Sequence, residues 1–513
     1  MDSIELTIFA SRINALCDEM GAVLRRAALS PNIKDRLDFS CAVFDARGEL
    51  CAQAAHIPVH LGSMAYAMAS IVSELSWRPG DMVIVNDPFL GGTHLPDVTL
   101  IAPVFYDSEL VAFVANRAHH ADIGASTPGS MPLSQRLDEE GVIIPPSYLI
   151  RAGQMDNDFL ASIISATGNV EQSHGDFSAQ ISANRTGVMR LTMLLELLGG
   201  ESFNEALVQL NSYAERMAHG ALASIPDGCY LFEDVMDDDG MGNRSLPIKV
   251  AMTVAGGSIV VDFGGTAAQT RGNINCPLSV AAAAVYYVFR CLMPPQTPAC
   301  AGSFRAIDIV APPASLVNAR RPAAVAAGNV ETSTRIVDVV IGALAQAIPE
   351  QVAAASHGSM NNVAMGARGE VSWDYYETLG GGMGASARQH GLSAVQTHMT
   401  NTLNTPVESL EMHYPLRVHR YSVRRGSGGQ GQHRGGEGLV REFEFLRPTT
   451  VTLLTERRYQ RPWGLRGAEA GAVGRNYLDG SLLPAKVSFE AQAGQRLVIE
   501  TAGGGGFGMA DTE

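Results

Sequence analysis

Three short polar signatures interrupt an apolar stretch of the chain between residues 86 and 122, and they restrict how this stretch can fold. They read Asn86-Asp87-Pro88, Thr93-His94-Leu95-Pro96-Asp97 and Arg117-Ala118-His119-His120-Ala121-Asp122. Between the last two, the apolar segments 98–106 and 110–116 flank Asp107-Ser108-Glu109, a pattern that predicts a β-hairpin. Residues that enter one strand and leave its antiparallel neighbour lie at the same end of a hairpin. We therefore expect the second and third signatures to meet in the fold.

Histidines gather around this hairpin. Five of the thirteen lie between residues 56 and 120, namely His56, His60, His94, His119 and His120. Pro96 prevents a regular helix between His94 and Asp97, so a loop must hold this pair, and loops commonly present ligands. Imidazoles and carboxylates from two segments can bind one divalent metal. From spacing alone, a metal site and a buried structural cluster are equally open for this pair, whereas His56 and His60 are more typical of structural histidines.

Two further segments have an ambiguous pattern. Asp38 stands at the entrance of another predicted hairpin, formed by segments 39–44 and 49–54. It could cap the entry of the strand, or it could be a carboxylate that binds a metal or orients water. The segment Gly328-Asn329-Val330-Glu331-Thr332 precedes a predicted helix and is typical first of all of a capping segment.

The apolar periodicity predicts a mixed architecture. Helical spacing is expected over residues 13–27, 61–75, 158–224 with a break at Gly199-Gly200, 278–292 and 333–347. Short strands with glycine-rich turns alternate with the last two helices. The predicted fold class is α/β (mixed α+β) in several layers, with hairpins and helices in an N-terminal region followed by a β-rich C-terminal region. Because 513 residues exceed one ordinary core, we divide the chain into regions 1–225, 226–440 and 441–513. The first region would hold the metal site, the second would be mixed α/β, and the third would be rich in strands.

Composition excludes some functions and favours assembly. Hydrophobic residues make up 46% of the chain and charged residues 17%, which suggests that partner subunits cover part of the surface. A net charge of −15, without any run of more than two Lys or Arg, argues against a nucleic-acid partner. Seven cysteines without a CxxC pair fit reduced thiols in the cytoplasm. The N-terminus lacks the layout of a signal peptide, and the apolar run 277–293 contains Arg290, so we expect a buried helix and no membrane span.

Glycines cluster in three bursts in the last third of the chain, at 380–384, 426–431 and 503–506. None has the Lys-Ser/Thr ending of a P-loop or the full dinucleotide-binding spacing. Turns and close approaches between backbones are the favoured interpretation, and this chain is not expected to bind ATP by a P-loop.

Several segments together resemble the hydantoinase B family, from about residue 4 to the C-terminus. They are Asp35-Arg36-Leu37-Asp38-Phe39-Ser40-Cys41-Ala42, the stretch from Asn86 to Asp97, Gly328-Asn329-Val330-Glu331-Thr332-Ser333, Tyr376-Glu377-Thr378-Leu379-Gly380-Gly381-Gly382, Thr400-Asn401-Thr402, Pro406-Val407-Glu408 and the run from Gly503 to Gly508. That family includes B-type subunits of ATP-dependent hydantoinases, 5-oxoprolinase and caprolactamase, and related subunits of acetone and acetophenone carboxylases.

The resemblance implies that two different subunits carry out successive steps of one reaction, and it implies a set of site residues. A separate A-type ATPase subunit would phosphorylate the carbonyl or enolate oxygen of the substrate, and this chain would complete the reaction. By the same resemblance, His94, Asp97 and His119 would bind Mn, Zn or Fe. Asp38 becomes a candidate fourth ligand or base, and His120 and Asp122 would orient His119 or the attacking water.

Within this resemblance, ATP-dependent hydrolysis of a cyclic amide, such as a hydantoin, 5-oxoproline or a lactam, is the preferred function. Carboxylation of a ketone is the alternative, which the length of the chain weakly disfavours, and a non-catalytic scaffold of an ATPase is a third possibility. The expected assembly is a cytoplasmic hetero-oligomer with an A-type ATPase subunit and a B-type dimer core.

Overall fold

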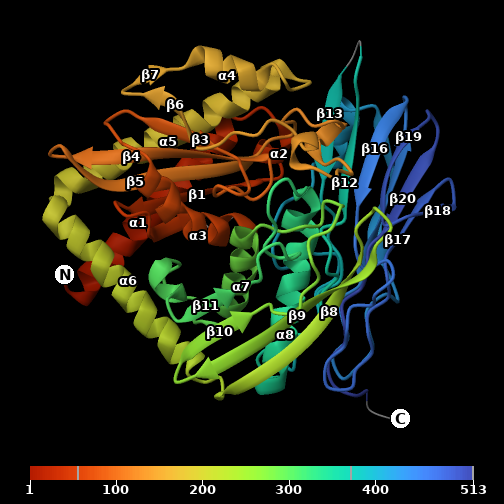
Figure 1. Cartoon of the computed structure of the whole chain (residues 1–513). Coiled ribbons are helices and arrows are strands. Elements are labelled where there is room, and N and C mark those ends of the chain that lie inside the picture. The colour runs from red at the N-terminus through yellow and green to blue at the C-terminus, as the bar shows by residue number, and fades with distance from the viewer. Residues whose placement is uncertain (55–56, 370–371, 511–513) are drawn as a thin grey trace.

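The strands of this chain form four sheets within residues 1–54, 57–369 and 372–510, which are the residues that the computed structural model describes. Helices cover the N-terminal and central sheets, and the C-terminal strands stand at the opposite side of the molecule (Figure 1). This mixed arrangement of antiparallel sheets and helices confirms the predicted fold class. His56, one of the clustered histidines, lies outside the described residues.

The N-terminal sheet has seven strands in the order β2-β1-β5-β4-β3-β6-β7, and every neighbouring pair is antiparallel. Both hairpins expected from the sequence are present, since β1 pairs with β2 and β4 pairs with β5. The strands are β1 (Phe39–Asp45), β2 (Leu50–Ala54), β3 (Met82–Val85), β4 (Asp97–Tyr106), β5 (Glu109–His119), β6 (Ser147–Arg151) and β7 (Gln154–Met155).

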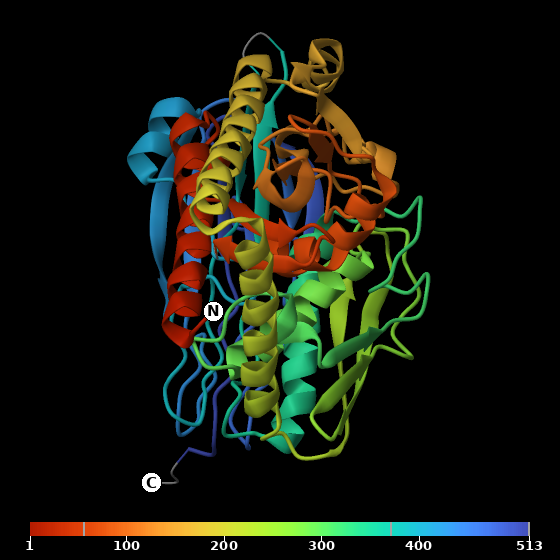
Figure 2. The ribbon, with the colours of Figure 1, turned by 90° about the vertical axis from the view of Figure 1, so that its left-hand side faces the viewer.

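Helices bury both faces of this sheet. Side chains alternate along a strand, so Val114 packs in the core formed with α1 (Ser3–Ala27) and α5 (Val170–Leu198), whereas Phe113 packs with α3 (Pro58–Glu74) on the other face. Figure 2 shows α1 in red alongside α5 in yellow. Shorter helices α2 (Pro31–Lys34) and α4 (Asn157–Ile164) flank this layer, and α6 (Gly200–Leu222) runs from it towards the central region.

The central sheet has the order β11-β10-β9-β8, in which only β10 and β11 are parallel among the described strands. Its strands are β8 (Gly228–Asp238), β9 (Arg244–Ala255), β10 (Ser258–Asp262) and β11 (Ile307–Val310). The helices α7 (Leu278–Leu292) and α8 (Ser333–Ala347) have the predicted bounds. The apolar run is therefore a buried helix, and no helix that the structure describes has the length and apolar character needed to cross a membrane.

The C-terminal part is a sandwich of two antiparallel sheets around one core. One sheet contains β13 (Trp373–Glu377), β12 (Asn362–Ala367), β16 (Thr449–Leu454) and β19 (Lys486–Ala491) in that order. The other contains β14 (Leu416–Arg424), β15 (Gly438–Phe445), β20 (Arg496–Glu500), β17 (Arg475–Leu478) and β18 (Ser481–Leu483), and α9 (Val407–His413) precedes it. Both sheets join strands from either side of residue 440, and the division into three regions stays a prediction.

The glycine bursts pack backbone against backbone beside this sandwich. A Cβ atom on Gly382 would lie 1.9 Å from the carbonyl oxygen of Gly436, and one on Gly504 would lie 2.1 Å from that of Met383. The amide of Gly504 donates a hydrogen bond to the carbonyl of Gly436 at 2.9 Å. The bursts are thus close backbone approaches that leave no room for side chains, as expected from the sequence.

Candidate metal centre

The candidate site lies where three neighbouring strands of the N-terminal sheet begin or end. In the register of β4 and β5, Asp97 stands directly opposite His119. On the other side of β5, β1 begins at Phe39, and the amide of His119 donates to the carbonyl of Asp38 at 3.0 Å. Cross-strand neighbours have side chains on one face within contact distance. The sheet register therefore brings Asp38, Asp97 and His119 together.

A short loop between β3 and β4 carries His94 into the same place. Asn86 fixes this loop, because its amide nitrogen donates to the carbonyls of Leu95 and Val142 at 2.8 and 2.9 Å. Its side-chain oxygen accepts from the amide of Ile144 at 2.6 Å. The first polar signature is thus structural, since it shapes the loop that presents His94.

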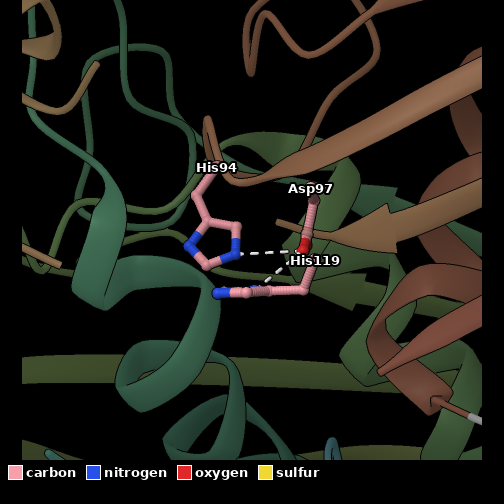
Figure 3. A group of neighbouring side chains, drawn as sticks. All are labelled: His94, Asp97 and His119. Carbon is pink, nitrogen blue, oxygen red and sulfur yellow. Dashed lines mark hydrogen bonds and ion pairs between the residues drawn. The ribbon is translucent and has the colours of Figure 1, made fainter. Parts of the chain in front are cut away.

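His94, Asp97 and His119 form a tight group, and their nearest ligand atoms all lie within 4.8 Å of one another. Asp97 Oδ1 is 3.2 Å from His94 Nε2 and 3.2 Å from His119 Nδ1, as the dashed lines in Figure 3 show. With metal–ligand bonds of about 2.0–2.2 Å, two ligand atoms around a tetrahedral zinc lie roughly 3.3–3.6 Å apart. The observed separations are close to that spacing.

Two nitrogen atoms of the group have no partner of their own. His94 Nδ1 and His119 Nε2 are buried without a hydrogen bond to any residue that the structure describes, and His94 Nε2 faces the carboxylate of Asp97 at 3.2 Å. Buried polar atoms are normally paired, so unpaired imidazole nitrogens around a carboxylate are informative. Imidazole nitrogen and carboxylate oxygen are ligands that suit Zn, Mn and Fe. These residues fit a divalent metal.

Electrostatics in the group favour the metal-binding forms of two ligands. Burial raises the pKa of Asp97, but the imidazoles of His94, His60 and His119 more than offset it and hold that pKa well below its usual value. Burial lowers the pKa of His119 and outweighs the attraction of Asp97 and Asp38. Burial also acts to lower the pKa of His94, yet Asp97 reverses this and raises it. An ionised carboxylate and a neutral imidazole are the forms that bind metals.

The second oxygen of Asp97 is held by three other groups. Oδ2 accepts a hydrogen bond from Thr93 Oγ1 at 2.6 Å and from Asn329 Nδ2 at 3.3 Å, and His60 Nε2 lies 3.3 Å away. His60 is buried, as expected of a structural histidine, but it belongs to this site. Its Nε2 is also 3.9 Å from Asp38 Oδ1. The sequence placed His60 in the histidine cluster but favoured a structural role for it, because no local spacing links the first turn of α3 to Asp97.

Tyr376 closes one side of the group. Its ring is stacked on that of His119, with centroids 4.8 Å apart and an interplanar angle of 8°. The guanidinium of Arg36 lies 4.9 Å from the centroid of the same ring. A cavity of about 20 Å³ is lined by Asp38, His60, Asp97, His119, Asn329 and Tyr376 among others. This volume has room for about one water molecule.

Two predicted site residues, His120 and Asp122, lie away from the group. His120 points away from His119, towards α5, where its Nε2 lies 2.9 Å from Gln180 Oε1 and its ring lies against Phe177. Asp122 instead fixes a loop by accepting hydrogen bonds from the amides of Gly124 and Gly168 at 2.7 and 2.6 Å. Successive residues of a strand face opposite sides, so His119 and His120 cannot both reach the group. The structure therefore does not bring His120 and Asp122 to it.

The segment 328–332 is not a cap. It is a π-helical turn, η4 (Gly328–Thr332), from which α8 continues, and it makes no capping hydrogen bond through a side chain.

Comparison with known proteins gives matches over almost the whole chain. The family model described as Hydantoinase B/oxoprolinase matches residues 2–510. An uncharacterised protein of Methanocaldococcus jannaschii is 40% identical over 99% of this chain and 91% of its own length. 5-Oxoprolinase 1 of Arabidopsis thaliana is 37% identical over 99% of this chain, which spans 42% of that protein.

The fold is also similar to a solved structure. The ATP-dependent caprolactamase from Pseudomonas jessenii superimposes with a TM-score of 0.93 at 27% sequence identity, over 99% of this chain and 91% of that one.

Proposed function

The chain belongs to the hydantoinase B/oxoprolinase family, and we propose that it hydrolyses a cyclic amide as the B-type subunit of an ATP-dependent amidohydrolase. The substrate class would be a hydantoin, 5-oxoproline or a lactam. An A-type subunit would use ATP to phosphorylate the carbonyl oxygen of the substrate, and this chain would then complete the hydrolysis. The names of the similar 5-oxoprolinase and ATP-dependent caprolactamase support this class of reaction. Because this chain spans 42% of the 5-oxoprolinase, the rest of that protein leaves room for the activity that we assign to the partner.

The chemistry explains why two activities are needed. Resonance makes the carbonyl carbon of an amide unreactive towards water. Phosphorylation of the amide oxygen removes that resonance and turns the oxygen into a leaving group. Water can then add to the same carbon, and the ring nitrogen leaves with a proton to give an acyl phosphate. A second water molecule hydrolyses this acyl phosphate to the carboxylate and free phosphate.

In this proposal, His94, Asp97 and His119 hold a divalent metal, and their imidazole and carboxylate groups suit Mn, Zn and Fe alike. When bound, such an ion would polarise a substrate oxygen and lower the pKa of a water molecule. Asp97 remains ionised and presents Oδ1 to both histidines, while Thr93 and Asn329 hold Oδ2.

Asp38 and His60 have a different part in the proposal. Both line the cavity beside Asp97, and Asp38 Oδ1 lies 3.9 Å from His60 Nε2, so one water molecule between them can contact both. We assign Asp38 as a fourth ligand or as the base that takes a proton from this water. The cavity of about 20 Å³ is too small for an amide ring, so substrate binding must separate the segments around it. The observation that carries the proposal is the set of unpaired, buried imidazole nitrogens around Asp97.

The test is to co-express this chain with its A-type subunit and to measure ATP hydrolysis with hydantoins, 5-oxoproline, lactams, and ketones with bicarbonate. We expect turnover with a cyclic amide, a stoichiometric divalent metal by elemental analysis, and loss of both metal and activity in His94→Ala. The exposed His174 provides a matched control, and His174→Ala should keep both. Turnover with ketones only when bicarbonate is present would assign a carboxylase. A metal-free chain with unchanged activity in His94→Ala would leave only the scaffold.

A further inference from the structure

The π-helical turn η4 contacts both sides of the candidate metal centre. We propose that it positions two ligands: Asn329 restrains Asp97 directly, and Glu331 restrains His119 through Asn362 and Tyr376. This inference rests on the metal site of the proposed function and adds to it a set of positioning residues outside the ligands.

The turn has the geometry that such a role requires. The amide of Ser333 donates to the carbonyl of Gly328, five residues back, which is the hydrogen bond of a π-turn. Single π-turns are rare and occur frequently at functional sites. A Cβ atom on Gly328 would lie 1.8 Å from the carbonyl oxygen of Asn275, and Thr332 Oγ1 donates to the carbonyl of Ile274 at 2.5 Å. Both ends of the turn are therefore fixed against the same buried segment.

Glu331 begins a chain of hydrogen bonds that ends at His119. Its Oε1 accepts from Asn362 Nδ2 at 2.7 Å and from the amide of Met360 at 2.9 Å. Asn362 Oδ1 in turn accepts from the hydroxyl of Tyr376 at 2.6 Å. The ring of Tyr376 is the one stacked on His119.

The orientation of Asn362 is determined by its neighbours. Its Nδ2 has two donor hydrogens, and these go to Glu331 and to the carbonyl of Leu454 at 2.9 Å. The amide oxygen must then face Tyr376. Loss of the acceptor on Glu331 would free Asn362 to rotate, and the hydroxyl of Tyr376 would lose its fixed partner.

Asn329, on the same turn, acts on the other ligand. Its Nδ2 donates to Asp97 Oδ2 at 3.3 Å, next to the shorter hydrogen bond from Thr93. With Oδ2 restrained in this way, Oδ1 is left facing His94 and His119. Groups that orient metal ligands typically change metal affinity by about 10–100-fold when they are removed.

The experiment measures metal affinity of the full chain, by competition for Zn²⁺ with a chromophoric chelator, together with the visible absorption of the Co²⁺-loaded protein. Tyr376→Phe keeps the stacked ring and removes only the hydroxyl. We expect about tenfold weaker Zn²⁺ binding and shifted Co²⁺ bands, because the orientation of His119 relaxes. Asn329→Ala should weaken binding by a similar factor. A purely structural role would change the unfolding temperature and leave the Co²⁺ spectrum unchanged.

Two controls sharpen the result. Tyr375 is the neighbour of Tyr376 on β13 and packs on the opposite face, in the C-terminal core, so Tyr375→Phe should bind Zn²⁺ as the wild type does. Glu331→Gln retains an oxygen that can accept from Asn362 and should keep near wild-type affinity, whereas Glu331→Ala should match Tyr376→Phe.

The outcomes separate this inference from the proposed function. Wild-type affinity and spectrum in both Tyr376→Phe and Asn329→Ala, with binding abolished in His94→Ala, would overturn the positioning role and leave the metal site intact. A wild-type chain that binds neither Zn²⁺ nor Co²⁺ would overturn both. Tyr376→Phe changes one hydroxyl, so the inference stays testable even if Glu331→Ala does not fold.

Discussion

Two buried polar centres of this molecule differ in how their charged and polar groups are paired. In the ion cluster between α8 and the C-terminal sheets, each cation lies against a carboxylate: Arg457 is 2.6 Å from Asp338, and Lys486 is 2.6 Å from Glu456. In the candidate metal centre, one carboxylate faces several imidazoles, and His94 Nδ1 and His119 Nε2 lack hydrogen bonds within the described part of the chain. The ion cluster pairs each of these cations with a carboxylate, and its atoms without hydrogen bonds, such as Arg457 Nε and Asp338 Oδ1, belong to groups already held in ion pairs. The candidate metal centre instead gathers imidazole nitrogens, which are metal-ligand atoms, around one carboxylate, and this points to a bound group.

The two centres also differ in location, because one joins two regions of the chain and the other lies at the end of a hairpin. The ion cluster ties the central region to the C-terminal sandwich, since Asp338 lies in α8, Lys486 lies in β19, and Arg457 follows β16. The candidate metal centre lies at the end of the hairpin β4–β5 in the N-terminal sheet, beside a cavity. Substitutions in the two centres should therefore have separable effects on stability and on activity.

The largest expected effect is that of His94→Ala, which removes a proposed ligand and should reduce activity with the proposed A-type subunit by about a thousandfold or more, equivalent to about 4 kcal/mol. The metal-free variant should also be somewhat less stable, because the His94 ring is buried and its Nε2 lies 3.2 Å from Asp97 Oδ1. Added Zn²⁺ should raise the unfolding temperature of the wild type only, since ligands stabilise the state that binds them. Calorimetry with and without metal measures this. An equal shift in both proteins would place the stabilising metal elsewhere.

Arg457→Ala should have the opposite profile. It leaves the carboxylates of Asp338 and Asp234 without their shared partner in a buried place, and removing one member of a buried pair costs about 3–5 kcal/mol. Urea unfolding measures this loss, and the Zn²⁺ affinity of the folded protein should stay that of the wild type. Arg466 is an exposed match that pairs with Glu350, so Arg466→Ala should change stability by less than about 1 kcal/mol. If Arg457→Ala lost metal and kept its stability, the contrast between the centres would fail.

Glu331 lies between the two centres, and its carboxyl group should make the stability of the protein depend on pH. Burial and the nearby charge of Glu456 raise its pKa to about 7 from 4.5. The folded state then holds this proton more tightly than the unfolded chain does, so stability is greatest below about pH 4.5 and falls as the pH rises through about 7. The whole loss is on the order of 3 kcal/mol.

Glu331→Gln has no such proton. The stability of the variant relative to the wild type should therefore increase between pH 5 and pH 8, when urea unfolding of the metal-free proteins is measured at each pH. Taking the difference cancels the contribution of Glu140, whose pKa is also raised to about 7 by burial. A difference that does not change with pH would show that Glu331 titrates normally.

The sequence predicted the elements that hold the site better than it predicted the contacts within it. The hairpin pattern was enough to place Asp97 near His119, because strand pairing converts a local spacing into a spatial one. It could not separate His119 from His120, since the end of β5 decides which of two adjacent side chains faces the group. Tyr376 and Asn329 come from segments more than two hundred residues away, and only the packing of the whole chain brings them to the site. Their motifs carried the family resemblance without indicating a contact.

His60→Gln should have the smallest effect. His60 contacts Asp97 Oδ2 together with Thr93 and Asn329, so its loss leaves two of the three restraints on that oxygen. We expect Zn²⁺ affinity to fall about tenfold, or about 1.4 kcal/mol, as for other groups that orient ligands. Chelator competition measures this, with His174→Gln as the exposed control.

The size of this effect also tests how many ligands the centre has. If His60 only restrains Asp97, its variant and Asn329→Ala should weaken Zn²⁺ binding to a similar extent and leave the stoichiometry unchanged. Loss of binding as complete as in His94→Ala would instead make His60 a ligand in its own right. His60 would then join His94, Asp97 and His119 as a residue that holds the metal, and the absence of a hydrogen bond at a ring nitrogen would not be enough to identify the ligands.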